Sequence, residues 1–385
     1  MFFFFVCHIF SSFRPFKTIK ISSKPARVSM AGFKHFLAVA EISDSINSFP
    51  PHLVVYMIGP SSITTMMNVP SPCYSLGTQL VPFQSGFYAT APASAFRWGE
   101  PGPLFYRILP PIYRDFRLSD YPRIPYGETF ATSFKGNLQI LCLPFSINRK
   151  PDCLVIEGNS TISLKPPTPV SLFGQAVAAS NNGSIIVTVS KESDDNAIVH
   201  FFSNHGKLFT SFEIPHSVPI TGRSKPPIIQ FLDDRTVIAA FTEINKIFLF
   251  RLTNNGWAMK QTSEISISSF SQSGQNIMTV DKNGNVLILD RVSFFQRNVA
   301  EIPKLLKNSE FTDISTGKDW FAVLEESENK RIIHVYSSKE SPLLRGIAIF
   351  VVFSVIAFIG ILVRANLNVN RVMKNITRRR NTKMV

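Results

Sequence analysis

Short runs of β-branched and aromatic residues alternate with clusters of Gly, Asn, Asp and Ser over most of the chain. The clearest case is ISISSFSQSGQNIMTVDKNGNVLILD, residues Ile265–Asp290. It predicts strands over Ile265–Phe270, Asn276–Val280 and Asn285–Leu289, separated by a Ser-Gly turn and a Lys-Asn-Gly turn. The Asn-Gly pair supplies the positive φ angles that a two-residue hairpin needs. This pattern is typical of an all-β chain.

The same pattern recurs in three further segments, Ala176–Phe212, Ile228–Leu252 and Phe311–Ser338. The first turns of the four segments are spaced by roughly 40 to 50 residues, which is the period of a four-stranded propeller blade. One such sheet cannot bury both of its faces, so the blades must stack around an axis. Seven blades of about 43 residues need about 300 residues. We therefore predict an all-β, WD-repeat-like β-propeller of seven blades over residues 33–340, although the region between Pro60 and Pro125 shows no clear strand pattern.

The stretch GIAIFVVFSVIAFIGILV, from Gly346 to Val363, contains no charged residue. As a helix it would be about 27 Å long, enough for the hydrocarbon core of a thin bilayer. A soluble helix of this length would carry a polar face. We therefore predict one transmembrane helix over residues 346–363, followed by a short basic tail, residues 364–385.

The formal net charge of +14 is concentrated at the two ends of the chain. The basic residues that no acid accompanies are Arg14, Lys17, Lys20, Lys24 and Arg27 near the start, and Arg364, Arg371, Lys374, Arg378, Arg379, Arg380 and Lys383 after the predicted helix. The remainder of the chain is nearly neutral. The high pI of 9.7 therefore reports a leader and a tail, and we expect no nucleic-acid partner.

Residues 1–29 precede the predicted propeller as a leader. Their apolar run, MFFFFVCHIF, comes before the basic residues, whereas a signal peptide has its basic residues first. Met30 begins the segment MAGFKHFLAVAEI, which runs directly into a predicted strand. We interpret the leader as a spurious or unstructured start, and a weak signal peptide remains the alternative.

Residues that would carry covalent chemistry are not grouped in any motif. The sequence has no nucleophile elbow, P-loop, dinucleotide-binding glycine pattern or zinc-binding helix motif, so we do not expect an enzyme. The histidines occur singly, which predicts surface positions; they include His35, His52, His200, His205, His216 and His334. A disulfide between Cys142 and Cys153 is geometrically conceivable, but we expect buried free thiols. Asn159, Asn182 and Asn375 begin glycosylation sequons, which are used only on the lumenal side of a membrane.

Two stretches resemble a known family. EISISSFSQSGQNIMTVDKNGNVLIL is similar to a late blade, and DWFAVLEESENKRIIHVYSSKESPLLRGIAIFVVF is similar to a last blade that passes into a membrane. Both resemble the endoplasmic-reticulum exchange factors for the small GTPase that initiates coat-complex-II vesicles, the prolactin regulatory element-binding protein family. The resemblance covers most of the chain in layout and is local in its residues.

The resemblance implies a guanine-nucleotide exchange factor in the endoplasmic-reticulum membrane, with one span, a cytosolic propeller and a small GTPase as partner. In that family a loop of the first blade binds potassium and contacts the GTPase. The matching segment, FLAVAEISDSINSFPPHLVVYMI, places this loop over Ser43–Pro51. The candidate contact residues are Ser43, Asp44, Ser45 and Asn47. The family's loop is glycine-rich, whereas this segment has no glycine between Phe33 and Ile58. We therefore expect no cofactor, with a potassium ion as the alternative.

The orientation of the propeller leaves other functions open. The seven basic residues after the predicted span favour a cytosolic tail, which would place the propeller in the lumen as a receptor or as a subunit of a chaperone complex. A membrane-tethered interaction scaffold is a third possibility. Lys330, Arg331, Lys339 and Arg345 precede the span and reduce the charge asymmetry. We therefore predict the cytosolic orientation.

Overall fold

The computed structural model describes residues 13–21, 27–42, 52–70, 76–91, 105–116, 127–144, 152–167, 171–191, 196–215, 226–273, 276–290, 296–328, 330–338, 360–361 and 363–364. The chain divides into two units, and the larger one, Ser12–Ser337, holds nearly all of these residues.

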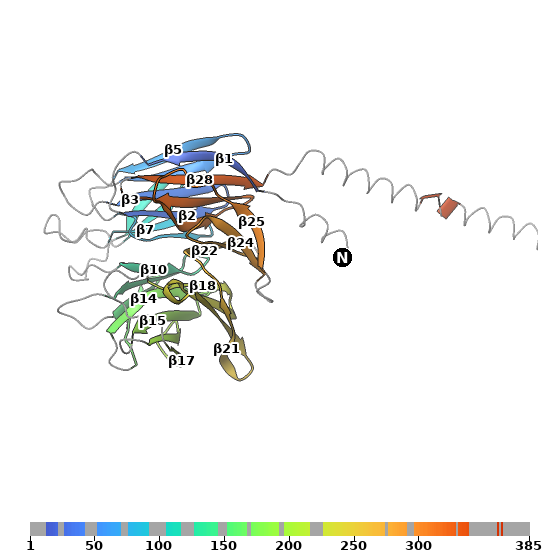
Figure 1. Ribbon diagram of the computed structural model, residues 1–385. Helices are drawn as coiled ribbons and strands as arrows, with labels where there is room; N and C mark the ends of the chain where they lie inside the picture. Colours follow the sequence, from blue (N-terminus) through green and yellow to red (C-terminus); the bar gives the residue numbers. More distant parts are fainter. Residues whose placement is uncertain are drawn as a thin grey trace, which may run out of the picture. The chain divides into compact units, whose positions relative to one another are not determined.

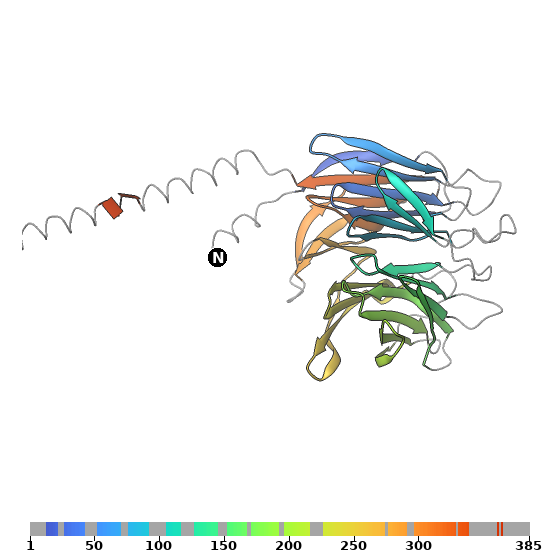
Figure 2. The same ribbon diagram turned by 180° about the vertical axis from the view of Figure 1, so that it is seen from behind.

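Seven four-stranded antiparallel sheets form the blades (Figures 1 and 2). Blade 1 contains β2 (Arg27–Phe33), β3 (Phe36–Ile42), β4 (His52–Ile58) and β5 (Ile63–Pro70), and blade 2 contains β6 (Leu80–Phe83), β7 (Gly86–Thr90), β8 (Phe105–Leu109) and β9 (Ile112–Phe116). Blade 3 contains β10 (Thr129–Thr132), β11 (Leu138–Leu143), β12 (Asp152–Glu157) and β13 (Ser160–Leu164), and blade 4 contains β14 (Ser171–Ala179), β15 (Ile185–Lys191), β16 (Ala197–Ser203) and β17 (Leu208–Ile214). Blade 5 contains β18 (Ile228–Asp233), β19 (Thr236–Phe241), a short 3-10 turn (Thr242–Ile244), β20 (Lys246–Thr253) and β21 (Gly256–Glu264). Blade 6 contains β22 (Ser269–Ser273), β23 (Asn276–Val280), β24 (Asn285–Asp290) and β25 (Gln296–Glu301). Blade 7 contains β26 (Glu310–Thr316), β27 (Trp320–Glu326), β28 (Arg331–Ser338) and, from the start of the chain, β1 (Phe13–Lys20).

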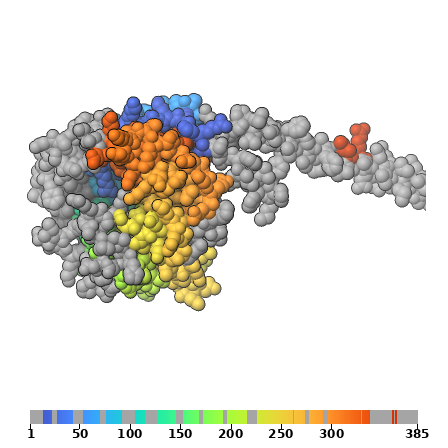
Figure 3. All heavy atoms as spheres, viewed as in Figure 1, coloured from blue at the N-terminus to red at the C-terminus, as the bar shows by residue number. Residues whose placement is uncertain are grey.

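The blades close into a ring. The first strands of neighbouring blades contact one another in the cycle β2, β6, β10, β14, β18, β22, β26 and back to β2. Strand β1 pairs with β28 as the outer strand of blade 7, so the two ends of the propeller sequence meet in one sheet. In Figure 3 the orange residues of the last blades border the blue residues of the first strands. The predicted seven-bladed propeller is therefore confirmed.

The propeller begins at Phe13 and not at residue 33, because β1 and β2 belong to it. Phe13, Phe16 and Ile19 are the half-buried apolar side chains of β1, and exposed residues separate them in pairs. This spacing of three hides the alternation that identifies a strand. The basic residues between them resemble the basic part of a leader, so the segment was predicted as a leader and not as a strand. Residues 1–12 and 22–26 of the predicted leader lie outside the described residues.

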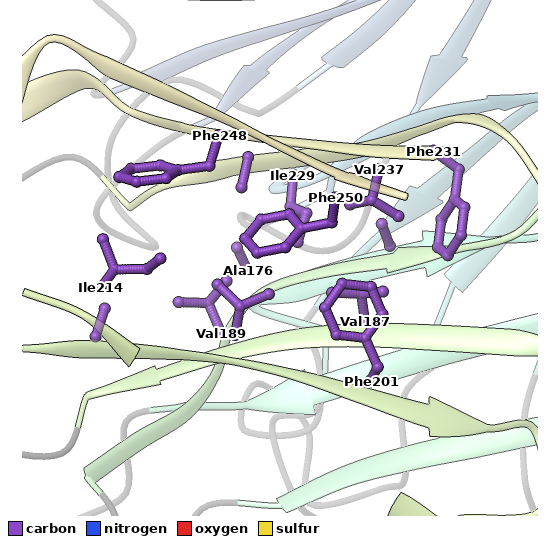
Figure 4. Close-up of a cluster of buried hydrophobic side chains, with 14 of the residues drawn as sticks. Ala176, Val187, Val189, Phe201, Ile214, Ile229, Phe231, Val237, Phe248 and Phe250 are labelled. Atoms are coloured by element: carbon purple, nitrogen blue, oxygen red, sulfur yellow. The ribbon is translucent and has the colours of Figure 1, made fainter. Parts of the chain in front are cut away.

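The hydrophobic core lies between the blades. Each of seven clusters of buried side chains in the described residues joins two neighbouring blades. Figure 4 shows the cluster between blades 4 and 5, where Val187 and Phe201 of blade 4 face Phe250 and Val237 of blade 5. Phe201 also stacks on Trp257 with 4.4 Å between ring centroids. Because every sheet buries both faces against its neighbours, no blade is a stable unit by itself.

The four repeats predicted from the sequence are blades 4 to 7, with two local differences in blade 6. The first strand begins at Ser269, so residues 265–268 are not part of it as predicted. The Asn-Gly turn is not a two-residue hairpin, because it extends over 281–284. The Asp281 carboxylate accepts hydrogen bonds from the backbone N–H of Asn283 and of Asn285, at 2.8 and 2.9 Å. Gly284 supplies the single positive φ, at 96°.

Cys142 and Cys153 form a disulfide and are not the free thiols that we expected. They are directly opposed residues of β11 and β12, with Cα atoms 4.0 Å apart. Both are fully buried between blades 3 and 4. Gly174 of β14 packs on the bridge, and a Cβ atom at this position would lie 2.6 Å from the Sγ of Cys153. The sequence spacing alone did not give the strand register that opposes the two cysteines.

Candidate functional surface

The direction of the strands gives the propeller two different faces. The connections from first to second and from third to fourth strand open on one face, and none of them exceeds five residues. We call it the short-turn face. The connections from second to third strand and from one blade to the next open on the opposite face and reach 14 residues between β7 and β8. We call it the long-loop face. Long connections on a rigid scaffold are where propellers usually bind partners.

Both ends of the propeller sequence lie on the short-turn face. Strand β28 is the third strand of blade 7, and its last residue, Ser338, is therefore at the end where the third-to-fourth connections open. Strand β1 is the fourth strand and starts at the same face with Phe13. The chain therefore leaves toward the predicted span at Gly346 from the short-turn face.

The predicted contact residues Ser43, Asp44, Ser45 and Asn47 lie outside the described residues. The two strands that hold their loop are described: β3 ends at Ile42 and β4 begins at His52. The connection between them joins the second and third strands of blade 1, so the loop belongs to the long-loop face. The sequence prediction therefore places the candidate residues on the face opposite the exit of the chain.

A buried acidic residue at the base of this loop was not predicted. Glu41 is only 7% exposed, and its strand register places it opposite His52. Burial raises the pKa of Tyr56 in β4, and the charge of Glu41 raises it further. The sequence signal was available, because Glu41 is the single charge in the apolar strand FLAVAEI.

The short-turn face is held together by hydrogen bonds between turns of neighbouring blades. The backbone N–H of Gln84 donates to the carbonyl of Phe134 at 2.7 Å, which joins blades 2 and 3. The backbone N–H of Lys318 and the indole Nε1 of Trp320 both donate to the carbonyl of Lys34, each at 2.7 Å, which joins blades 7 and 1. This face is therefore a firm surface, built from short turns with fixed neighbours.

The buried acid–histidine pair in blade 7 is structural. Glu325 accepts hydrogen bonds from the backbone N–H groups of Leu305 and Leu306, from the Ser309 hydroxyl and from Nε2 of His334, which lies 2.7 Å from Oε2. Burial opposes ionisation of Glu325, but these hydrogen bonds outweigh it and lower its pKa. The carboxylate is 0% exposed and fixes the loop before β26 to strands β27 and β28. It has no access to a substrate.

His200 occupies the corresponding place in blade 4. Its Nε2 lies 2.7 Å from Oγ of Ser190 and its Nδ1 lies 2.8 Å from Oγ of Ser211. Burial lowers the pKa of His200 to about 4. His200 and His334 are 1% and 4% exposed, so the predicted surface position is wrong for both. Sequence reasoning missed them because a histidine in a strand core carries no distinct local pattern.

In the part of the chain that the structure describes, no three His, Cys, Asp or Glu side chains come together in a way that could hold a metal ion. The described residues also contain no helix that is long and apolar enough to span a membrane. Of the predicted span, Gly346 lies outside the described residues, and Val363 is described with an exposed side chain.

Comparisons with known proteins agree with the fold. The β-propeller domain of Cps50 (Swd1) from Myceliophteria thermophila matches with a TM-score of 0.55 and 12% identity, over 85% of this chain and 100% of that chain. Raptor from Chaetomium thermophilum matches with a TM-score of 0.56 and 9% identity, over 87% of this chain and 30% of that chain. The sequence matches no protein-family model and no curated protein sequence. At these identities the likeness is one of fold, and the chain contains a WD-repeat-like β-propeller of seven blades.

Proposed function

We propose that this protein is a membrane-anchored β-propeller that acts as a guanine-nucleotide exchange factor for the small GTPase that initiates vesicle budding at the endoplasmic reticulum. The observation that carries the proposal is the opposition of the two faces. The loop of blade 1 between Ile42 and His52 opens on the long-loop face, and the chain departs from the other face at Ser338. A partner bound at this loop would meet no obstruction from the membrane anchor.

Exchange by such a surface needs no covalent chemistry. The propeller binds the nucleotide-free GTPase more tightly than the GDP-bound form, and by linkage it lowers the affinity of the GTPase for GDP by the same factor. A typical coupling free energy of about 1–3 kcal/mol corresponds to a change of about 5–150-fold. The predicted span keeps the propeller at the membrane where the activated GTPase would be needed.

The test is the rate at which labelled GDP leaves the coat GTPase of the same organism. Residues 12–338 should accelerate release, and Asp44→Ala combined with Asn47→Ala should remove most of the acceleration. Arg235→Ala is the matched control, because this residue is exposed in the β18–β19 turn of the short-turn face and has no assigned binding role. Unchanged GDP release with the intact propeller would eliminate the exchange function, and equal losses in the two variants would eliminate the assigned loop.

The disulfide favours a second candidate function, that of a lumenal receptor or of a subunit of a chaperone complex. Disulfides persist in the lumen of the endoplasmic reticulum and are rare in the cytosol. The Cys142–Cys153 bridge is accompanied by two sequons whose asparagines, Asn159 and Asn182, are exposed in turns. The basic tail would then lie in the cytosol, as the positive-inside rule favours.

Protease protection of intact microsomes distinguishes the two orientations. One tag is inserted after Ser193, between β15 and β16 of the propeller, and another is placed after Val385 in the full chain. Digestion of the first tag with protection of the second supports the cytosolic exchange factor. The reverse result, together with a mobility shift on glycosidase treatment, supports the lumenal candidate. A cytosolic propeller without exchange activity would leave the membrane-tethered scaffold.

A further inference from the structure

Several exposed apolar side chains of the described residues lie on the short-turn face of blades 2 to 4. Ile112 is 61% exposed, Phe134 51% and Phe209 50%. Tyr113 and Leu208 are exposed beside them in the chain. All five lie in or directly after the turns β8–β9, β10–β11 and β16–β17. Single exposed apolar residues need no explanation, but five in the turns of three successive blades call for a partner.

Among the described residues, the long-loop face exposes fewer large apolar side chains. Leu305, in the connection between β25 and β26, is 56% exposed and is the large apolar residue that the described connections of this face expose. The other exposed apolar residues of the described propeller are methionines within β4, β5 and β21, namely Met57, Met66 and Met259. Among the described residues, exposed aromatic side chains and most exposed aliphatic side chains of the propeller's turns therefore lie on the short-turn face.

Exposed lysines accompany the apolar side chains. Lys135 follows Phe134, Lys207 precedes Leu208, and two further exposed lysines, Lys34 and Lys318, lie in the turns of blades 1 and 7. Aromatic and aliphatic side chains beside lysine are typical of a surface that rests on phospholipid, because the apolar part enters the headgroup boundary and the ammonium stays with the phosphates.

Four acidic residues on the described part of this face accept a hydrogen bond from their own or a neighbouring blade, or stand next to a lysine. The carboxylate of Asp234 accepts from the backbone of Asn182, that of Asp233 accepts from the backbone of Arg235, and that of Glu157 accepts from the side-chain amide of Asn204. Asp319 is next to Lys318, and Asp290 ends β24. Asp233, Asp234 and Asp290 belong to blades 5 and 6, whereas Glu157 of blade 3 contacts the turn of blade 4 that also carries Lys207.

The covalent connection puts a membrane within reach of this face. Seven residues separate Ser338 from Gly346, where the predicted span begins. Even fully extended, they cover about 28 Å at most. The headgroup layer itself takes up about 5–8 Å of this distance on one side of the bilayer. The short-turn face is therefore the face of the propeller that is tethered nearest to lipid.

We infer that the short-turn face of blades 2 to 4 is a docking surface for the phospholipid bilayer into which the predicted span of the same chain inserts. Ile112, Phe134 and Phe209 enter the headgroup boundary, and Lys135 and Lys207 bind lipid phosphates. Docking fixes the propeller with its long-loop face toward the aqueous phase. The inference rests on the predicted span and on the cytosolic orientation, because Asn159 and Asn182, the glycosylation positions of the lumenal candidate, lie in turns of the same face.

The first test is flotation of residues 12–338 with vesicles. This unit closes its own ring of blades and contains its own core, so it can be studied without the span. We expect it to float with phosphatidylcholine vesicles that contain phosphatidylserine, more weakly with phosphatidylcholine alone, and less at high salt. Each lysine near an anionic surface contributes about fivefold in partitioning, so Phe134→Ser with Lys135→Glu should reduce binding by more than tenfold.

The matched control is Leu305→Ser with Lys304→Glu, which makes the same kind of change on the long-loop face. It should leave flotation within about twofold of the unaltered unit. The absence of flotation, or equal losses in the two variants, would overturn the docking surface. The GDP-release assay in solution should be unaffected by Phe134→Ser with Lys135→Glu, which separates this inference from the exchange function.

A second measurement uses the full chain and does not depend on the isolated unit. The chain is reconstituted in vesicles that contain brominated phospholipids, which quench tryptophan near the headgroup boundary. Phe134→Trp should gain fluorescence that these lipids quench, and Leu305→Trp should gain fluorescence that they do not quench. Equal quenching at the two positions, or none at residue 134, would contradict the docking geometry.

Discussion

Deletion of residues 1–29, so that the chain starts at Met30, should destabilise the whole propeller. The deletion removes β1 and the first residues of β2. Strand β1 is the outer strand of blade 7, and its loss leaves β28 as an unpaired edge. An exposed edge strand also promotes association between chains. The predicted leader is therefore a structural part of the fold, and its removal tests this directly.

The magnitude follows from what β1 buries. Phe13 packs edge-on against Phe321 with ring centroids 4.9 Å apart, and Phe16 and Ile19 pack on the core between blades 7 and 1. Full burial of such a side chain contributes about 1.5–3 kcal/mol, so three half-buried ones contribute about 2–4 kcal/mol. The lost strand pairing and the newly exposed partners add to this value. Because domains are stable by about 5–15 kcal/mol, the shortened chain should be only marginally folded.

Urea unfolding, followed by the fluorescence of Trp257 and Trp320 in a Trp98→Phe background, compares residues 12–338 with residues 30–338. Both tryptophans are buried in the propeller, so their emission reports its unfolding. Within residues 12–338, Phe16→Ser should lower the unfolding free energy by about 1–2 kcal/mol, whereas the exposed control Lys17→Ser should change it by less than about 0.5 kcal/mol. If residues 30–338 unfold at the same urea concentration as residues 12–338, the structural role assigned to β1 is wrong.

Three further predictions concern buried polar groups and the disulfide. Glu325→Ala should lower the unfolding free energy by about 3–5 kcal/mol, because it leaves His334 and three further donors without their buried acceptor, and denaturant titration measures it. Burial lowers the pKa of His200 from 6.5 to about 4 in the folded state. The neutral histidine therefore contributes to the unfolding free energy above pH 6.5, and this contribution of about 3 kcal/mol is lost as the pH falls from 6.5 toward 4. In His200→Gln the unfolding free energy should no longer show this pH-dependent loss. Cys153→Ser should lower the unfolding free energy by about 3 kcal/mol according to the loop-entropy model, and Cys142→Ser should show the same loss. The bridge would be disproved if mass spectrometry found both thiols free in protein isolated under alkylating conditions.

The sequence predicted the parts of the fold whose signals are local. Blades 4 to 7 have strands with β-branched residues and turns with Gly or Asn, so alternation and turn chemistry were sufficient. Blade 2 has short strands, β6 to β9, with two successive prolines, Pro110 and Pro111, between the last two. Its position follows only from the ring, because a closed propeller must fill the space between blades 1 and 3.

Pairing between strands that are distant in the sequence could not be predicted from local sequence patterns. Strand β1 finds its partner β28 more than 300 residues later, and no feature of the segment around Phe13 indicates this partner. The opposition of Cys142 and Cys153 likewise depends on the register between β11 and β12. For the candidate surface, the sequence predicted a loop after Ile42, but the face on which it opens required the direction of every strand in the blade.

Strand β1 and the disulfide together narrow the question of orientation. A signal peptide cleaved after residue 29 would remove β1, so the lumenal candidate requires any cleavage to fall before Phe13. The cytosolic candidate requires that the Cys142–Cys153 bridge persist against the reducing pool of that compartment. Both sulfurs are buried under Gly174 between two blades, so reduction would first require local opening of the propeller. The state of these two cysteines in protein isolated from its own cell, read beside the position of its first residue, therefore discriminates between the candidates independently of any activity assay.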